Sequence, residues 1–490
     1  MTPAAVPPPE LPTSSAAAKG WRAGTLTYTS AGLVTLFCWL LLGDFAWAMR
    51  DRSVGPTAQW YLSHLKVPNL LFGLLIGSFP ALIGLVLTPI VSVKSDHHRG
   101  RFGRRIPFLL VMTPLAALGM VGLALTPLLA RELHHALAAP ATIDGVRALL
   151  GDGRLTGLLQ SEKAAAVLCF GLFWALFECA SITSQNVFAG LINDVVPVSL
   201  LGRFYGLFRM VSLVDGMLFN YWIIGKVPSH YTLILLVLGT CYGAAFLWVC
   251  FKVKEGIYPP PETRAQAEIS NSPISATPPR RFTAAIRSYF RESFTHPYYL
   301  ALFLMLTTAG LCFTPVNTFS IPYARSLGVG MDLYGRTMVL TFTISLALSF
   351  PLGWLADRFH PLRVGMVVLA GYAAVALWGS RYATTAHAFL VGWLLHGVLS
   401  GCYYTCAASL GQRLFPRSRF AQFASASGIL NAVASLGMAP LVGLLIDRSG
   451  NLYRYTFAAA LLFSTAALAA AWYAHGKFMK LGGPRNYVAP

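Results

Sequence analysis

Residues 95–107 read SDHHRGRFGRRIP and residues 353–363 read GWLADRFHPLR, two polar stretches that each follow an apolar run. Each places one Asp at the end of the run and Arg a few residues later, in a short loop. A second repeated motif is Pro197…Gly202-Arg203-Phe204, which corresponds to PRSRF at residues 416–420. Two independent repeated motifs at corresponding positions predict a chain built from two structurally related halves, as alternating access requires.

Apolar runs of membrane-spanning length recur along the whole chain. A helix needs about 20 residues to cross about 30 Å of hydrocarbon. Twelve runs qualify: 29–58, 67–92, 106–129, 162–190, 203–226, 231–253, 298–322, 334–356, 362–383, 386–411, 420–446 and 453–476. We therefore expect an all-α integral membrane protein with twelve transmembrane helices in two six-helix pseudo-symmetric bundles.

The composition of the 490 residues excludes several other classes of protein. Hydrophobic residues make up 56% of the chain and charged residues 11%, whereas soluble chains are about 45–50% apolar and about 25% charged. This balance excludes a cytosolic enzyme, a disordered chain and a secreted disulfide-stapled fold. The eight cysteines lie in apolar stretches without a CxxC pair, so we interpret them as buried hydrophobes and expect no metal or cofactor site.

Polar segments divide the chain and predict its orientation. We expect a flexible tail (1–28), a first bundle (29–253) with an extracytoplasmic insertion (131–161), a Pro- and Ser-rich linker (254–297), a second bundle (298–476) and a C-terminal tail (477–490). The net charge of +19 comes mainly from segments on the same side as the two termini. Because basic residues crowd cytosolic loops, we expect a multi-pass inner (cell) membrane protein with both termini cytoplasmic and no nucleic-acid partner.

The loop at 95–107 resembles the Asp-Arg-x-Gly-Arg-Arg type loop between helices 2 and 3 of the major facilitator superfamily. Its SD…RGRFGRRIPF pattern is similar to that of glycoside–pentoside–hexuronide cation symporters and plant sucrose transporters. GDFAWAM at 43–49 is similar to the helix 1 motif of the same group, which includes melibiose permeases. The resemblance implies the major facilitator fold, symport of a sugar or glycoside, and function as a monomer. Sodium-coupled melibiose permeases carry two helix 2 carboxylates where Gly84 and Thr88 stand here, which favours protons as the coupling ion.

Asp44 is the leading candidate for contact with a substrate. It lies in the apolar run LVTLFCWLLLGDFAWAM without an adjacent cation, and helical spacing places Trp47 and Asp51 on the same face. A carboxylate accepts hydrogen bonds from sugar hydroxyls, and an indole covers the apolar face of a pyranose. The resemblance also implies a sugar-binding Asp in this motif. A purely structural ion pair is the alternative.

Arg50-Asp51-Arg52 interrupts the first apolar run and leaves two alternatives open. The triplet either begins an ordinary extracellular loop, or the helix continues through residues 53–62. In the second case the triplet forms an outer gate or a site for an acidic substrate such as a uronate.

Four ionisable groups inside the predicted helices are candidates for proton coupling. They are Asp44, Glu178, Arg209 and Asp215, and Gln185 shares the Glu178 face at i+7. Charges inside a bilayer cost a few kcal/mol or more, so they face a cavity or a partner. Forming and breaking an Arg–carboxylate pair changes the carboxylate's proton affinity, which links protonation to conformation. A permanent ion pair, or an Arg209 side chain reaching the cytosol, is the structural alternative.

The second half contributes neutral polar groups and a second loop motif. His396, Asn317 and Tyr403 are candidates for hydrogen bonds to substrate, although such residues often only join helices. The two repeated loop motifs, at residues 95–107 and 353–363, supply a cytosolic gate that we expect to stabilise the outward-open state. Its residues are Asp96, Arg104, Arg105, Asp357, Arg358 and Arg363.

The leading hypothesis is a secondary active transporter that moves a sugar or glycoside with a proton by alternating access. A major facilitator exporter of drugs or other metabolites is the alternative within transport. A non-transporting sensor would need a larger cytosolic domain than residues 254–296 provide. An enzyme would need a nucleotide loop, a nucleophile motif or clustered metal ligands, and the sequence contains none.

Overall fold

The computed structural model describes residues 21–139, 142, 161–257, 287, 289–416 and 419–490. The long regular elements of this part of the chain are helices, and its two strands, β1 (Trp21–Ala23) and β2 (Leu26–Tyr28), form a hairpin. Most of the predicted tail (1–28), insertion (131–161) and linker (254–297) lies outside the described residues.

The first half contains the helices up to Lys252. They are α1 (Ser30–His64), α2 (Asn69–Gly73) continued by the π-helix η1 (Leu74–Ser78) and α3 (Phe79–His97), α4 (Ile106–Leu137), α7 (Glu162–Val195), α8 (Leu201–Leu218) and α9 (Val227–Lys252). The turn η2 (Val198–Leu200) precedes α8, and η3 (Phe219–Ile223) and η4 (Ile224–Lys226) join α8 to α9. Side-chain caps explain where α1 and α7 begin, since the Thr29 and Ser161 hydroxyls accept hydrogen bonds from the backbone N–H groups of Gly32 and Ala164.

The second half repeats this pattern. Its helices are α12 (Pro297–Ser326), α13 (Met331–Phe359), α14 (Pro361–Tyr382), α15 (Ala386–Ala407) followed by the short α16 (Leu410–Leu414), α17 (Phe420–Arg448), α18 (Tyr455–Lys480) and the short α19 (Gly483–Asn486). The two echoed motifs lie at corresponding places, because residues 95–107 join α3 to α4 and residues 353–363 join α13 to α14.

Eleven helices in the described part of the chain are long and apolar enough to cross a membrane, and one of them accounts for two crossings. This helical segment, Val198–Lys252, has 55 residues, which would measure about 80 Å if it were straight. Instead, η3 and η4 interrupt it, His230 has non-helical backbone angles, and both α8 and α9 pack against α1. The segment therefore folds back on itself, as the predicted spans 203–226 and 231–253 require.

The same helix pairs form in both halves. In the first half α1 packs on α8 and α9, α4 packs on α7 and α9, and α3 packs on α7. In the second half the equivalent α12 packs on α17 and α18, α14 packs on α15 and α18, and α13 packs on α15. This correspondence gives the two bundles their pseudo-symmetry.

Helix α1 settles the alternatives for the Arg50-Asp51-Arg52 triplet. The helix continues without a break to His64, so the loop interpretation is wrong. Arg50 is buried against neighbouring helices, and Arg52 donates a hydrogen bond to Ser212 of α8. These contacts compensate the charges that interrupt the apolar run.

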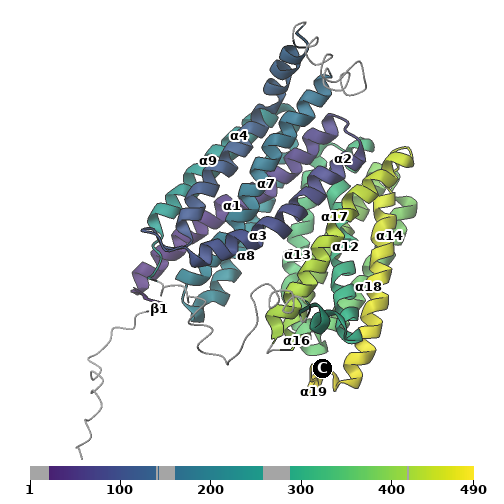
Figure 1. The fold of residues 1–490 in the computed structure, drawn as a ribbon. Coiled ribbons are helices and arrows are strands. Elements are labelled where there is room, and N and C mark those ends of the chain that lie inside the picture. Colours follow the sequence, from purple (N-terminus) through teal and green to yellow (C-terminus); the bar gives the residue numbers. More distant parts are fainter. Residues whose placement is uncertain (1–20, 140–141, 143–160, 258–286, 288, 417–418) are drawn as a thin grey trace, which may run out of the picture.

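The two halves lie side by side along α2, α3 and α17 (Figure 1). Contacts between them join α2 and η1 to α17, η3 and η4 to α13, and α1 to α12. We call this the closed end; it comprises the helix ends near residues 60–78, 219–232, 322–335 and 436–456. The opposite helix ends, near residues 95–106, 194–204, 357–363 and 413–420, form the open end.

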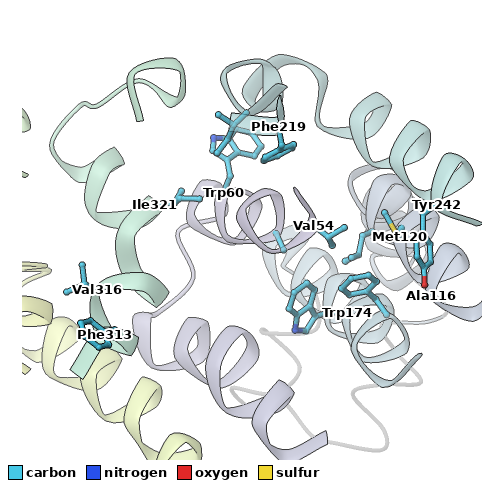
Figure 2. Packing of buried hydrophobic residues seen from close by; sticks show 14 of the residues in the cluster. Val54, Trp60, Ala116, Met120, Trp174, Phe219, Tyr242, Phe313, Val316 and Ile321 are labelled. Atoms are coloured by element: carbon cyan, nitrogen blue, oxygen red, sulfur yellow. The ribbon is translucent and has the colours of Figure 1, made fainter. Parts of the chain in front are cut away.

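A large apolar cluster runs through both halves. Figure 2 shows part of it, with Val54, Met120 and Trp174 in the first half and Phe313 and Val316 in the second. Many apolar side chains on the outer surface are exposed instead, among them Leu172 and Trp472. Such a surface suits contact with lipid rather than with water.

Candidate functional site

Helix α1 buries Asp44 in the middle of the first half. The residue has no exposed surface, and neither carboxyl oxygen has a hydrogen-bond partner among the described residues. Trp47 is half-buried one turn later, and Asp51 is exposed a further turn on. The predicted face therefore exists, but it runs from a buried carboxyl group to an exposed one.

Arg50 lies in an aromatic cage. Its guanidinium carbon is 5.3 Å from the ring centre of Trp47, 5.4 Å from that of Tyr242 and 5.7 Å from that of Phe177. The side chain is 1% exposed and donates a hydrogen bond to the Ser181 hydroxyl. Cation–π contacts of this kind compensate part of the cost of burying a cation.

Glu178 of α7 faces the charged segment of α1. It is half-buried and lies within electrostatic range of Arg50 and Asp51. Ser181, three residues later, contacts Arg50, whereas Gln185 is exposed. The structure thus brings Glu178 close to Arg50 and leaves Gln185 on the open surface of the same helix.

Asp215 of α8 is the second fully buried carboxyl group. Both of its oxygens lack a hydrogen-bond partner among the described residues, and it lies within electrostatic range of Asp44 and Arg52. Arg52 reaches α8 itself, where its Nη2 donates to Ser212 Oγ at 3.2 Å. Arg209, which the sequence suggested as a partner for these carboxylates, is exposed. Arg52 is instead the cation within electrostatic range of Asp215.

Arg52 also connects this cluster to the second half. Its guanidinium carbon lies 5.6 Å from the ring centre of Phe342, which belongs to α13. Arg52 therefore links the buried carboxyl groups of the first half to the boundary between the halves.

In the second half, His396 is fully buried within a polar network. Its Nδ1 lies 2.8 Å from the Tyr372 hydroxyl and its Nε2 lies 3.0 Å from Asn317 Oδ1. In a neutral imidazole one nitrogen donates and the other accepts, so His396 donates to one of these two groups and accepts from the other. Asn317 is exposed, whereas Tyr403 is buried with its hydroxyl unpartnered among the described residues. Asn317 is thus the accessible end of this network.

The predicted gate residues form contacts within their own halves at the open end. Arg104 pairs with Asp194, and Arg105 pairs with Asp96 at 2.5 Å. Glu255 accepts hydrogen bonds from the backbone N–H groups of Arg104, Arg105 and Ile106 and so caps the start of α4.

The second half has its own arrangement at this end. Arg413 pairs with Asp357 at 2.5 Å, and Arg363 donates to His475 at 3.2 Å. The Arg358 guanidinium lies 5.2 Å from the Trp354 ring centre. These contacts hold the two loop motifs to their own bundles in this conformation. Among the described residues, no three His, Cys, Asp or Glu side chains are grouped as a metal site would need.

Comparisons with known proteins agree with this architecture. A family model described as the Major Facilitator Superfamily matches residues 302–481. The proton-associated sugar transporter A of Mus musculus, like that of Rattus norvegicus, is 36% identical over 105 residues. This match covers 21% of this chain and only 13% of each relative's length.

Solved structures match over most of the chain. A bacterial homolog of the human lysosomal transporter Spinster, inward-facing and unoccupied, has a TM-score of 0.63 at 14% identity, covering 94% of this chain and 100% of that chain. The inward-open xylose transporter XylE from E. coli has a TM-score of 0.59 at 13% identity, covering 90% and 95%. The chain has the major facilitator fold. The predicted all-α membrane architecture is thereby confirmed, and at these identities the likeness is one of fold.

Within the major facilitator fold, several residues of the site were not predicted from the sequence. Tyr242 and Phe177 complete the Arg50 cage, and Ser212 holds Arg52. All three come from helices far from α1 in the chain. The aromatic residue three positions before Arg50 was the one local signal for a cage.

Proposed function

We propose that this protein is a secondary active transporter of the major facilitator superfamily that couples a small polar solute to protons by alternating access. The observation that carries the proposal is the position of Asp44 and Asp215. Both are fully buried in the first half without hydrogen-bond partners among the described residues, and Arg52, within electrostatic range of Asp215, contacts the second half. A fold of two such halves is suited to rocking about a central site.

The two buried carboxyl groups are suited to carry the proton. An ionised carboxylate in an apolar interior is costly unless it is paired, and binding a proton removes that cost. Arg52 lies within electrostatic range of Asp215 and also contacts Phe342 of the other half. Movement of the halves would shift Arg52 relative to Asp215 and so change the carboxyl group's proton affinity. Glu178 lies within electrostatic range of Arg50 and is suited to the same role.

A sugar or glycoside is the proposed solute. Trp47 offers an apolar ring, and Gln185 and Asn317 offer exposed amide groups in opposite halves. His396 contacts Asn317 from the buried side and is suited to orient it, and Tyr403 is buried with an unpartnered hydroxyl. Arg50 is enclosed by three rings and Ser181, which favours a neutral sugar over a uronate. The proton-associated sugar transporter and the xylose transporter among the similar proteins support the same solute class.

The proposed orientation places both termini and the open end in the cytoplasm and the closed end outside. The loop arginines at the open end support it, because basic residues concentrate on the cytosolic side. This conformation is then inward-open. Arg104, Arg105, Arg358 and Arg363 would exchange their contacts within each half for contacts across the mouth in the outward-open state.

Asp44→Asn tests the proton role. A gradient of one pH unit supplies about 1.4 kcal/mol per proton, enough for about tenfold accumulation of solute. We expect the variant to retain exchange of labelled sugar across proteoliposome membranes but to lose this pH-driven accumulation. The exposed Glu132→Gln is the matched control and should accumulate sugar normally. Full accumulation by Asp44→Asn would contradict the proposal. Loss of exchange by a folded variant would also contradict the proton role and would indicate that Asp44 binds the sugar.

A further inference from the structure

Hydrogen bonds between the two halves gather at the closed end of the described structure. Asp447, near the end of α17, accepts three of them. Its Oδ1 accepts from the Asn69 backbone N–H at 2.9 Å and from Asn69 Nδ2 at 2.8 Å, and its Oδ2 accepts from the Leu70 N–H at 2.9 Å. The carboxylate of one half thus caps the first turn of a helix in the other.

This cap replaces one that the helix lacks. Asn69 begins a continuous helical segment that runs to His97, and the residue before it, Pro68, provides no side-chain cap. The first N–H groups of a helix have no partner within the helix, and a carboxylate at this position is favoured by both hydrogen bonding and the helix dipole. The helix start is therefore capped only while the halves are in contact.

Two further residues of the second half complete the contact. Asn69 Nδ2 also donates to Asn451 Oδ1 at 2.8 Å, and Asn69 Oδ1 accepts from the Tyr453 hydroxyl at 2.9 Å. Asn451 has a φ of 64°, a left-handed conformation that Asn adopts more readily than most residues. The Asn69 side chain is thus fully engaged by the second half.

Glycines set the distance at which this contact forms. A Cβ on Gly443 would lie 2.1 Å from the Asn69 carbonyl oxygen, and one on Gly73 would lie 2.5 Å from the Ala439 carbonyl oxygen. The two helices therefore approach backbone to backbone, and a small separation would break the cap.

The pseudo-symmetric position lacks an equivalent cap. There the start of α13 meets the end of the α8 segment, and Asp332 lies against Gly225. Asp332 instead pairs with Arg336 of its own helix at 3.0 Å. The polar contact at Asp447 is therefore a feature of one side of the closed end.

We infer that Asp447 is a latch that holds the closed end shut and so sets the balance between the two access states. The inference rests on the proposed alternating access, but not on the identity of the solute. When the closed end opens, the cap is lost and the Asp447 carboxylate and the Asn69 and Leu70 N–H groups must bind water instead. Losing a helix cap of this kind shifts an equilibrium by about 3- to 30-fold.

Cysteine labelling from each side tests the latch in the full-length chain with its eight native cysteines replaced. Ser78→Cys reports the closed end, because Ser78 is buried there and its Oγ donates to the Leu436 carbonyl of the other half at 2.5 Å. Thr88→Cys reports the other side, in the cavity of about 420 Å³ between α3 and α17. We expect Asp447→Ala to raise labelling at position 78 by about 3- to 30-fold and to lower it at position 88.

Asp332→Ala at the same end is the matched control and should leave both rates unchanged. Asp447→Asn keeps one acceptor oxygen and should restore part of the wild-type pattern. Unchanged labelling in Asp447→Ala, or a rise at both positions as partial unfolding would produce, overturns the inference. Because labelling needs no solute, failure of sugar transport would leave this result interpretable on its own.

Discussion

His360 illustrates how its surroundings fix the state of a single side chain at a helix junction. It lies between α13 and α14 with a φ of 76°, and its Nδ1 accepts from the Leu362 backbone N–H at 3.3 Å. Its ring centre is 4.6 Å from that of Phe478. Burial, aided by the charges of Arg413 and Arg363, lowers the pKa of His360 from 6.5 to about 4. The residue is therefore a neutral imidazole that caps α14.

This pKa predicts a loss of stability in mild acid. Between pH 6.5 and about 4 the unfolded chain binds a proton at His360 that the folded chain does not, so the stabilisation present above pH 6.5 is lost as the pH falls. His360→Asn keeps a residue that tolerates positive φ and can cap, but it does not titrate. We expect the wild-type Tm to fall a few degrees more than that of the variant between pH 7 and 4.5. Thermal unfolding in detergent measures both Tm values. An equal fall of Tm with pH in the wild type and in His360→Asn would contradict the assignment of this stability loss to His360.

At the residue scale, the sequence indicated the ionisable groups but not their partners. Asp44, Glu178 and Asp215 are visible because a carboxylate is unusual in an apolar run. The pairing of Arg52 with Ser212, in place of Arg209 with a carboxylate, depends on which faces α1 and α8 present to each other. No local pattern encodes that choice, because the two residues are far apart in the chain.

At the scale of helices, glycines determine how closely the two halves approach. A Cβ on Gly335 of α13 would lie 2.1 Å from the carbonyl oxygen of Asn220. On the same helix, a Cβ on Gly353 would meet nothing within 4 Å. The two positions form a natural test of close packing between halves.

We expect Gly335→Ala to lower the free energy of unfolding by about 1–3 kcal/mol, because overpacking forces the backbone apart. Gly353→Ala should be neutral or stabilising by up to about 1 kcal/mol, because Ala favours a helix over Gly. Thermal unfolding of both variants in the same detergent measures the difference. Equal effects would show that the crossing of α13 with the α8 segment tolerates a methyl group.

Most element boundaries could be predicted from apolar periodicity, since the predicted spans agree with the helices to within a few residues at most ends. The first span was predicted too short, because the Arg50-Asp51-Arg52 charges conceal a helix that continues to His64. The π-turn η3 and the turn η4 were also not predicted. They form where the α8 segment meets α13, so tertiary contact determines them.

At the scale of the whole molecule, the two halves touch at the closed end and hold their loop motifs separately at the open end. Asp447 and the glycine crossings account for the first feature, and the pairs Arg105–Asp96 and Arg413–Asp357 account for the second. The repeated loop motifs predicted this division into halves. Which end is closed could not be predicted, because it depends on contacts between helices of different halves.

The most direct test of the central claim is solute uptake by the wild-type protein in proteoliposomes. Labelled mono- and disaccharides and a uronate would be screened with an imposed gradient of one pH unit, and in parallel with a sodium gradient. We expect one neutral sugar to accumulate up to about tenfold with the pH gradient and not with sodium. The absence of proton-driven uptake across the panel, by protein shown to be folded and inserted, would contradict proton-coupled sugar transport and favour an exporter of another solute.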